Sequence, residues 1–475
     1  MSSTAVRTAV PIAPMWKVVL ATACAGGMAW GIRGQYGHET GAMIAGLLVS
    51  LVLVRLLAPM ADGLAAARAV ALGTIAMGFG GTETYGQTIG LTHDPELVGN
   101  VAALRWGMLG LAIKGGIWIG FCGVFLGMGL GGVRYPGREM FLLLLGILGL
   151  SALGIWWINQ PYDPAHRVLP RIYFSDDWRW EPGAVLKPRR EVWGGLALAL
   201  LGVLAYAGAV RRDALAWRVG LWGILGGAVG FPLGQCLQAW HAWHRPWFAN
   251  GPLAGIDRHV NWWNFMETTF GLVMGAALGA GFWLNRRRIR MPSPVPAGPP
   301  AIPAAFEAGL LALHGVLLAV CEFGSVGWVE RLYDFGPALG VIPVALVVVG
   351  RGAAWWMALP ITLLPIAGKT LVNLAYEERV VPVWLGWAIY VVVPLGVTVW
   401  LALRWTRNGP GRPAVDWLRP TLVTMAWLYF GLNLAFFRFP WPWAEWTART
   451  PNALVFLACA IVVTLLAGRR RAGEG

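Results

Sequence analysis

Polar side chains recur in four turns between apolar segments of the first 285 residues. Each turn places a glutamine beside a small or polar residue, and the next apolar segment carries a charged residue near its start. The glutamine pairs are Gly34-Gln35, Gly86-Gln87, Asn159-Gln160 and Gly234-Gln235, and the charged residues are Glu39, Lys114, Glu191 and Glu267. Polar groups inside apolar helices are costly to keep in a membrane and usually serve a function. Their recurrence predicts a shared polar site, to which Gln35, Gln87 and Gln235 contribute substrate-binding amides.

The first of these turns concentrates several kinds of chemistry. It contains a cation, an amide, an imidazole and a carboxylate, supplied by Arg33, Gln35, His38 and Glu39. Imidazole and carboxylate groups are common general acids and bases, so we predict catalytic roles for His38 and Glu39 and substrate binding by Arg33. The alternative is structural, because Glu39 would suit the positive end of its helix and an Arg33–Glu39 ion pair would close the turn.

Three ionisable residues lie deeper in the apolar segments. Glu83 falls near the end of one predicted span, Lys114 lies inside the next, and Glu267 lies near the start of another. A charged group in hydrocarbon usually faces the interior of the bundle and finds a partner, so we expect Lys114 to pair with Glu83 or Glu267. In a functional site the lysine would bind substrate and the glutamates would act as acid and base. The alternative is a static ion pair that fixes helix packing.

The segment 235–267 is rich in both polar and aromatic residues. His241 and His244 would share one face of a helix, and Asp257 follows in the same segment. We predict a catalytic role for Asp257 and substrate binding by His241, His244 and Asn264. This histidine spacing is only a weak sign of a metal site, and interfacial belts of His and Trp are common in membrane proteins, so no metal is predicted.

The composition determines the class of protein that must position these residues. Hydrophobic residues make up 57% of the chain and charged residues 13%, whereas about 25% charged residues is typical of soluble domains. We therefore predict an all-α polytopic integral membrane protein with about 14 transmembrane helices, each able to cross about 30 Å of hydrocarbon. The spans are expected near 16–32, 40–59, 66–85, 106–131, 139–158, 192–210, 215–235, 262–284, 306–328, 336–351, 354–372, 380–403, 418–437 and 453–468.

Basic residues indicate the orientation in the membrane. Runs of arginine occur at 211–212, 286–288 and 469–471, all on the same side of the predicted spans. Because cytoplasmic loops are enriched in Lys and Arg, this pattern predicts a bacterial cytoplasmic (inner) membrane protein with both termini in the cytoplasm. The net charge of +14 reflects this orientation and predicts no nucleic-acid partner.

One basic, proline-rich segment, 286–304, divides the chain. We predict an N-terminal bundle over 1–285, with about 8 spans arranged as four parallel helical-hairpin repeats, and a C-terminal bundle over 305–475 with about 6 spans. Glycine pairs at 26–27 and 226–227 lie at equal distances before Gln35 and Gln235, and small residues favour close helix packing in lipid. The segment 159–190 is long enough to form a cap over the site.

These features favour three functions. The first is a transporter or flippase-like protein with an outward-facing polar cavity for a polar or lipid-linked substrate, such as a glycan. The second is a membrane-embedded transferase or hydrolase with an extracytoplasmic site for a lipid-linked or glycan substrate, and the third is a structural subunit of a membrane complex. No nucleotide loop, GxSxG elbow or HExxH motif is present, so the cofactor remains unknown.

Overall fold

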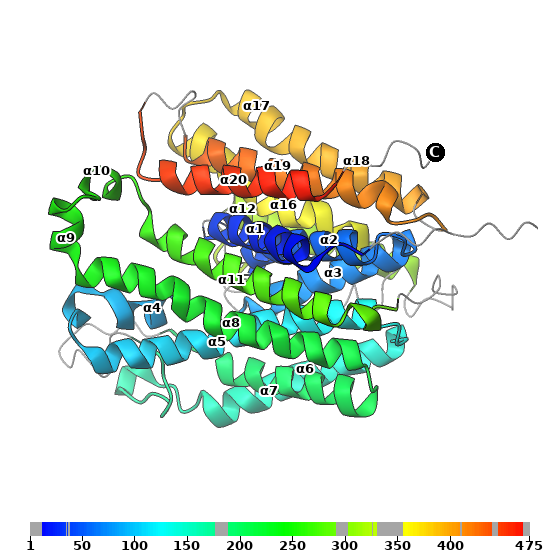
Figure 1. Ribbon diagram of the computed structural model, residues 1–475, viewed down its shortest axis with the longest axis horizontal. Helices are drawn as coiled ribbons and strands as arrows, with labels where there is room; N and C mark the ends of the chain where they lie inside the picture. The colour runs from blue at the N-terminus through cyan, green and yellow to red at the C-terminus, as the bar shows by residue number, and fades with distance from the viewer. Residues whose placement is uncertain are drawn as a thin grey trace, which may run out of the picture.

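The computed structural model is built from helices throughout the part of the chain that it describes (Figure 1). That part comprises residues 12–34, 36, 39–175, 189–290, 303–324, 326–329, 355–408, 411–438 and 445–468. The long helices run side by side, close to the horizontal direction of Figure 1. The prediction of an all-α fold is therefore confirmed.

The first part of the chain forms the helices α1 (Met15–Arg33), α2 (Glu39–Leu57), α3 (Gly63–Gly80), α4 (Gly86–His93), α5 (Val101–Leu130), α6 (Gly137–Ile158), α7 (Trp193–Ala205), α8 (Ala214–Trp243), α9 (Arg245–Asn250), α10 (Ala254–Asp257) and α11 (Trp262–Leu284). The later part forms α12 (Ala304–Phe323), α16 (Ala358–Leu371), α17 (Val383–Gly386), α18 (Val393–Asn408), α19 (Val415–Phe436) and α20 (Thr450–Leu466). Single π-helical turns extend α7 and α16 and join α17 to α18.

The helices account for the predicted membrane spans. Within the described residues, nine helices are long and apolar enough to cross a membrane, and shorter apolar helices include 41–57 and 450–466. Every predicted span coincides with a helix except 336–351, which lies outside the described residues. The chain is thus a polytopic helical membrane protein, and the expected total of about 14 spans stays a prediction.

Three short helices, α4, α9 and α10, were not predicted, and all lie at the left-hand end of the bundle in Figure 1. We refer to this end as the α9 end. The helix α4 packs against both α5 and α8. Its eight residues, Gly86–His93, are too few for a membrane span, so a search for long apolar runs does not detect it.

The glutamine turns differ from the prediction in their position relative to the helices. The helix α3 ends at Gly80, and Gln87 lies in the first turn of α4 instead of closing a span. Gln235 lies inside α8, which continues to Trp243. The expectation that each outward helix ends on its glutamine is wrong for these two residues, because the helical hydrogen bonding of α8 runs on past Pro232 and Gln235.

The four predicted hairpins correspond to the packed pairs α1–α2, α3–α5, α6–α7 and α8–α11. Glycines bring helices of different hairpins into backbone contact. A Cβ atom on Gly227 of α8 would lie 1.9 Å from the carbonyl oxygen of Gly115 in α5, and one on Gly26 of α1 would lie 2.4 Å from that of Gly271 in α11. These two contacts confirm the predicted packing role of the small residues.

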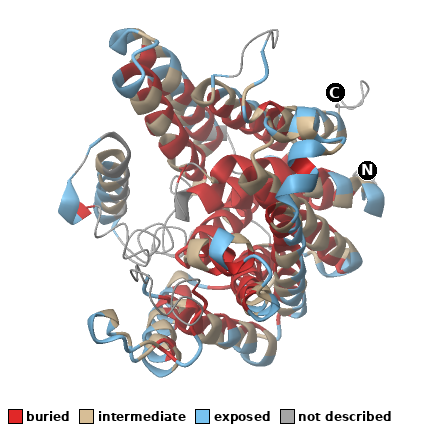
Figure 2. Ribbon diagram, turned by 90° about the vertical axis from the view of Figure 1, so that its left-hand side faces the viewer, coloured by how far each residue is buried: buried red, intermediate tan, exposed pale blue. Residues whose placement is uncertain are grey.

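The core is centred on α1 and α2, whose side chains are nearly all buried from Ala21 onward in α1 and from Gly41 onward in α2. Figure 2 shows buried residues concentrated in the middle of the bundle. Their apolar residues form one cluster with those of α11, α16, α19 and α20. The C-terminal helices therefore pack directly on the N-terminal ones, and side chains from both parts of the chain can contribute to one site.

Candidate functional site

A buried ion cluster lies where α5 passes the turn after α3 and the segment before α7. Lys114 Nζ is 3.0 Å from Glu83 Oε1 and 2.7 Å from Glu191 Oε1. The same ammonium donates to the Thr84 carbonyl oxygen at 2.7 Å and to Thr88 Oγ1 at 2.9 Å. We call Lys114, Glu83 and Glu191 the lysine cluster. Every donor of the ammonium group is in use.

Both carboxylates of the lysine cluster also accept a backbone hydrogen bond. Glu83 Oε2 accepts from Val192 N at 3.1 Å, and Glu191 Oε2 accepts from Phe174 N at 3.1 Å. Phe174 belongs to the segment between α6 and α7, so the cluster fastens that connection onto the bundle. With both glutamates ionised, the cluster carries one net negative charge inside the protein.

The expected pairing of Lys114 with Glu83 is confirmed, and Glu267 is not its partner. Glu191 is the partner that the sequence reasoning did not choose. The signal for it was available, because Glu191 is the charged residue that follows the third glutamine turn. The sequence does not predict this contact, because a long connection separates that turn from α7 and no local pattern indicates which helices Glu191 will contact.

Arg33, at the end of α1, lies in a second polar region. Its side chain is 2% exposed, and its guanidinium carbon lies 5.0, 5.3 and 5.5 Å from the ring centres of Trp30, Tyr85 and Trp118. Aromatic faces attract a cation through the ring quadrupole, which compensates part of the loss of water. The guanidinium atoms Nε and Nη1 are buried and have no hydrogen-bond partner among the described residues.

Glu267, in the first turns of α11, lies beside Arg33 and is fully buried. Its Oε1 accepts hydrogen bonds from the Tyr85 hydroxyl and from Trp263 Nε1, the latter at 3.1 Å, and its Oε2 accepts from Asn264 Nδ2 at 3.3 Å. A Cβ atom on Gly34 would lie 2.3 Å from Glu267 Oε2, so a larger residue at position 34 would displace the carboxylate of Glu267. Asn264 thus lies beside Glu267, and its predicted role in substrate binding stays a prediction.

Arg449, from the C-terminal part of the chain, completes this region. It precedes α20, donates through Nη1 to Asn264 Oδ1, and stacks on the Phe437 ring at 4.0 Å. We call Arg33, Glu267, Asn264 and Arg449 the arginine cluster. Arg449 was not predicted, because nothing in its local sequence links it to residues almost two hundred positions earlier.

The two clusters share one turn of the chain. Glu83 and the carbonyl of Thr84 contact Lys114, while the next residue, Tyr85, donates to Glu267 and lies against the Arg33 guanidinium. The lysine cluster and the arginine cluster are therefore neighbours on either side of the segment that joins α3 to α4.

The predicted glutamines have separate local roles. Gln87 Oε1 accepts from Arg189 N at 3.0 Å, and Gln235 Nε2 donates to Thr92 Oγ1 at 2.6 Å. Gln87 thus contacts the segment that precedes α7, and Gln235 contacts α4. Gln35 and His38 lie outside the described residues, as does the side chain of Glu39, so their predicted roles stay predictions.

His241 and Asp257 form a third group at the α9 end. His241 Nε2 is 3.0 Å from Asp257 Oδ1, and both side chains are partly exposed. The imidazole stacks on the Trp262 ring at 4.4 Å, and Trp262 Nε1 donates to the same Asp257 oxygen at 2.8 Å. His244 does not join this pair, since its Nδ1 bonds the Trp240 carbonyl of the preceding turn. Among the described residues, no three His, Cys, Asp or Glu side chains gather as a metal site requires.

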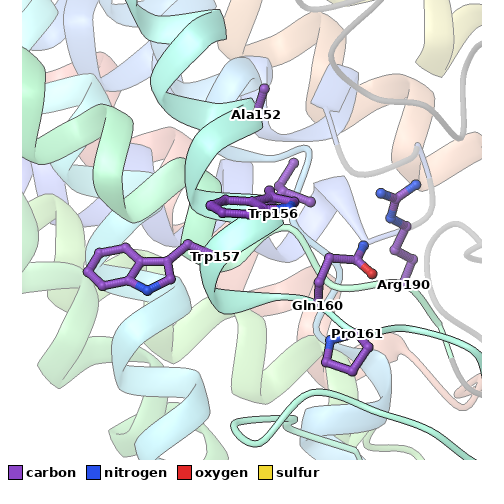
Figure 3. Close-up of a pocket in the computed structure, with 7 residues that line it drawn as sticks. Ala152, Trp156, Trp157, Gln160, Pro161 and Arg190 are labelled. Carbon is purple, nitrogen blue, oxygen red and sulfur yellow. The ribbon is translucent and has the colours of Figure 1, made fainter.

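A groove of about 750 Å³ lies beside the last turns of α6, lined by Ala152, Ile155, Trp156, Trp157, Gln160, Pro161 and Arg190. Figure 3 shows the Trp156 indole on one side and the Gln160 and Arg190 side chains on the other. The wall is apolar apart from Gln160 and Arg190, and Trp156 is 71% exposed. Arg190 directly precedes Glu191 of the lysine cluster in the chain, although its own side chain is exposed.

The residues expected to line one cavity thus fall into separate groups in this structure. Arg33, Glu83 and Glu267 are buried within closed clusters, whereas His241 and Asp257 lie nearer the surface. The structure pairs Lys114 with Glu83 and Glu191, and it places Arg33 near Glu267.

Comparisons with known proteins do not assign a family. No family model and no curated protein matches this chain. Among solved structures, a manganese transporter from Eremococcus coleocola in complex with an aromatic bis-isothiourea substituted compound aligns at 13% identity, over 98% of this chain and 90% of the transporter, with a TM-score of 0.17. A variant of the same transporter aligns at 14% identity and the same TM-score. A score this low does not show a common fold.

Proposed function

We propose that the chain is a membrane transporter or flippase-like protein whose substrate site is formed by the lysine and arginine clusters. The observation that carries this proposal is the pair of buried charge clusters joined through Tyr85 in a helical membrane bundle. Ionisable groups at membrane depth are rare, and they typically mark substrate or ion pathways.

The position of the arginine cluster supports transport over a purely structural role. Arg33 and Glu267 come from the N-terminal helices and Arg449 from the C-terminal part. Transporter sites commonly lie between two helix bundles that move relative to each other. A cluster that both parts of the chain complete is suited to alternating access.

The groove beside α6 supports a lipid-linked substrate. Its exposed tryptophans suit the headgroup region of a bilayer, and Arg190 offers a cation for a phosphate there. Under this proposal the protein resides in a bacterial inner membrane, and the α9 end faces away from the cytoplasm.

Reconstitution tests the proposal. The full-length protein in liposomes should take up compounds from a metabolite mixture, measured by mass spectrometry, or should move fluorescent phospholipid between leaflets, measured by dithionite quenching. Glu83→Gln and Glu267→Gln should abolish the activity. Glu139→Gln is a matched control, because Glu139 pairs with Arg211 outside both clusters. Equal activity in the wild type and both cluster variants, or none of either kind in the wild type, would contradict the proposal.

The His241–Asp257 pair favours a second function, an extracytoplasmic transferase or hydrolase. Asp257 orients the imidazole through Nε2, which leaves Nδ1 as the ring atom for proton transfer. The test is turnover of a lipid-linked oligosaccharide, measured by product release. Loss of turnover in Asp257→Asn with full turnover in Glu267→Gln would favour the enzyme.

A further inference from the structure

We propose that Arg33 and Arg449 bind an anionic oxygen group, a carboxylate or phosphate, where α1, α11 and α20 meet. This inference rests on the proposed transport function and assigns the chemical class of its substrate.

The first argument is the unused hydrogen-bonding capacity of Arg33. Its Nε and Nη1 are buried without a hydrogen-bond partner among the described residues, although its side chain is only 2% exposed. The three aromatic rings around it compensate its charge through their faces but accept no N–H bond in the plane of the guanidinium. Leaving buried donors of a charged group unsatisfied is costly, so such groups in native proteins call for a functional explanation.

The lysine cluster provides an internal comparison. Lys114 is buried to the same degree as Arg33, yet it contacts two carboxylates, a carbonyl and a hydroxyl. The fold is thus able to satisfy a buried cation completely. Arg33 differs in retaining donors for a ligand.

The charge balance specifies the sign of that ligand. The arginine cluster holds two guanidinium groups and one carboxylate, and both arginines interact electrostatically with Glu267. Glu267 already accepts hydrogen bonds from Tyr85, Trp263 and Asn264. One positive charge remains among the described side chains of the cluster. A cationic substrate would be repelled, whereas an anion would neutralise the cluster.

The geometry of the guanidinium group narrows the class to oxyanions. Its planar fork of N–H donors matches two oxygens of a carboxylate or a phosphate. Arg449 is held in place by Asn264 and the Phe437 ring, so it is positioned before the ligand arrives. Because Arg33 lies on α1 and Arg449 at the start of α20, one bound anion would connect the two parts of the chain.

Thermal unfolding of the purified full-length protein in neutral detergent tests the site. Sodium phosphate, sodium acetate and sodium chloride would be titrated at constant ionic strength. Phosphate or acetate should raise the melting temperature saturably, whereas chloride should not. Arg33→Gln and Arg449→Gln should each weaken the apparent affinity at least about tenfold, the effect of losing a charge-assisted hydrogen bond. Arg438→Gln, which alters an exposed arginine paired with Glu378, is the matched control.

Two further measurements separate weaker binding from misfolding of the variants and identify the source of the anion. Arg33→Lys keeps the charge but removes the fork, so it should fold and still bind more weakly than the wild type. In nanodiscs of phosphatidylcholine with and without phosphatidylglycerol, stabilisation by the anionic lipid alone, reduced in Arg449→Gln, would identify a lipid headgroup as the source. No saturable stabilisation by any of these anions, or equal affinity in all variants, would overturn the proposal. Anion binding without transport in liposomes would refute the transport function and leave this site intact.

Discussion

Lys114 is the residue whose replacement tests the structure most severely. In Lys114→Met, the methionine side chain fills much of the same volume, but Glu83 and Glu191 lose the ammonium that lies 3.0 and 2.7 Å from them. Removing one partner of a buried ion pair costs about 3–5 kcal/mol, because it leaves an uncompensated buried charge. Here two carboxylates lose their partner together, so we expect the unfolding free energy to fall by about 3–5 kcal/mol or more.

The matched variant neutralises the whole lysine cluster. In Lys114→Met/Glu83→Gln/Glu191→Gln, the glutamine oxygens can still accept the backbone hydrogen bonds of Val192 and Phe174. No charge is left buried, so the loss should be about 1–3 kcal/mol, and smaller than that of the single variant. Equilibrium unfolding in mixed dodecylsulfate–maltoside micelles, followed by tryptophan fluorescence, measures both values.

Arg105→Gln provides the control on the same helix, because Arg105 is exposed near the start of α5. Its unfolding free energy should stay within about 0.5 kcal/mol of the wild type. If Lys114→Met were as stable as the wild type, the ion cluster would not stabilise this fold. If the triple variant were less stable than Lys114→Met, the cost would come from lost hydrogen bonds instead of unpaired charge.

Two further predictions concern the close packing at Gly227 and the His241–Asp257 pair. Gly227→Ala should lower the unfolding free energy by about 1–3 kcal/mol, because its Cβ would lie 1.9 Å from the Gly115 carbonyl oxygen. A Cβ on Gly146 would have no atom within 4 Å, so Gly146→Ala should leave the unfolding free energy unchanged in the same micelle assay. A deficit in Gly146→Ala equal to that in Gly227→Ala would exclude overpacking as the cause. Asp257→Asn should leave liposome transport unchanged while perturbing only the partly exposed His241 pair, and loss of transport in this variant would place the pair inside the substrate pathway.

Long apolar runs made the helices predictable, because a membrane-spanning helix must bury its backbone polar groups and expose apolar side chains to lipid. The same criterion could not detect α4, which is short and polar and is held by α5 and α8 on either side. It also misplaced the fourth turn, since helix continuation through Gln235 depends on packing against other helices and not on local polarity.

The lysine cluster was only half predictable. A lone ammonium in hydrocarbon demands a carboxylate, and Glu83 was near in the chain and at a similar depth. The contacts of Glu191 and Arg449 join segments that lie far apart in the chain. The periodicity of apolar residues does not indicate which distant segments will be in contact. Tyr85 was missed for a different reason: an aromatic residue in a turn normally indicates packing, and its hydroxyl bond to Glu267 becomes visible only in three dimensions.

The turn between α3 and α4 is the part of the molecule through which the two clusters would influence each other. Thr84 offers its carbonyl to Lys114, and Tyr85 donates to Glu267 while its ring lies 5.3 Å from the Arg33 guanidinium carbon. An anion that drew Arg33 away from the Tyr85 ring would shift Tyr85. The backbone of Tyr85 directly follows that of Thr84, whose carbonyl oxygen accepts a hydrogen bond from Lys114. With both glutamates ionised, the lysine cluster carries net negative charge and the arginine cluster net positive charge, so the two clusters attract each other, and a bound anion that neutralised the arginine cluster would weaken that attraction. We therefore expect anion binding at the arginine cluster to change the electrostatic potential at Glu83 and Glu191, whose carboxylates accept hydrogen bonds from Val192 N and Phe174 N.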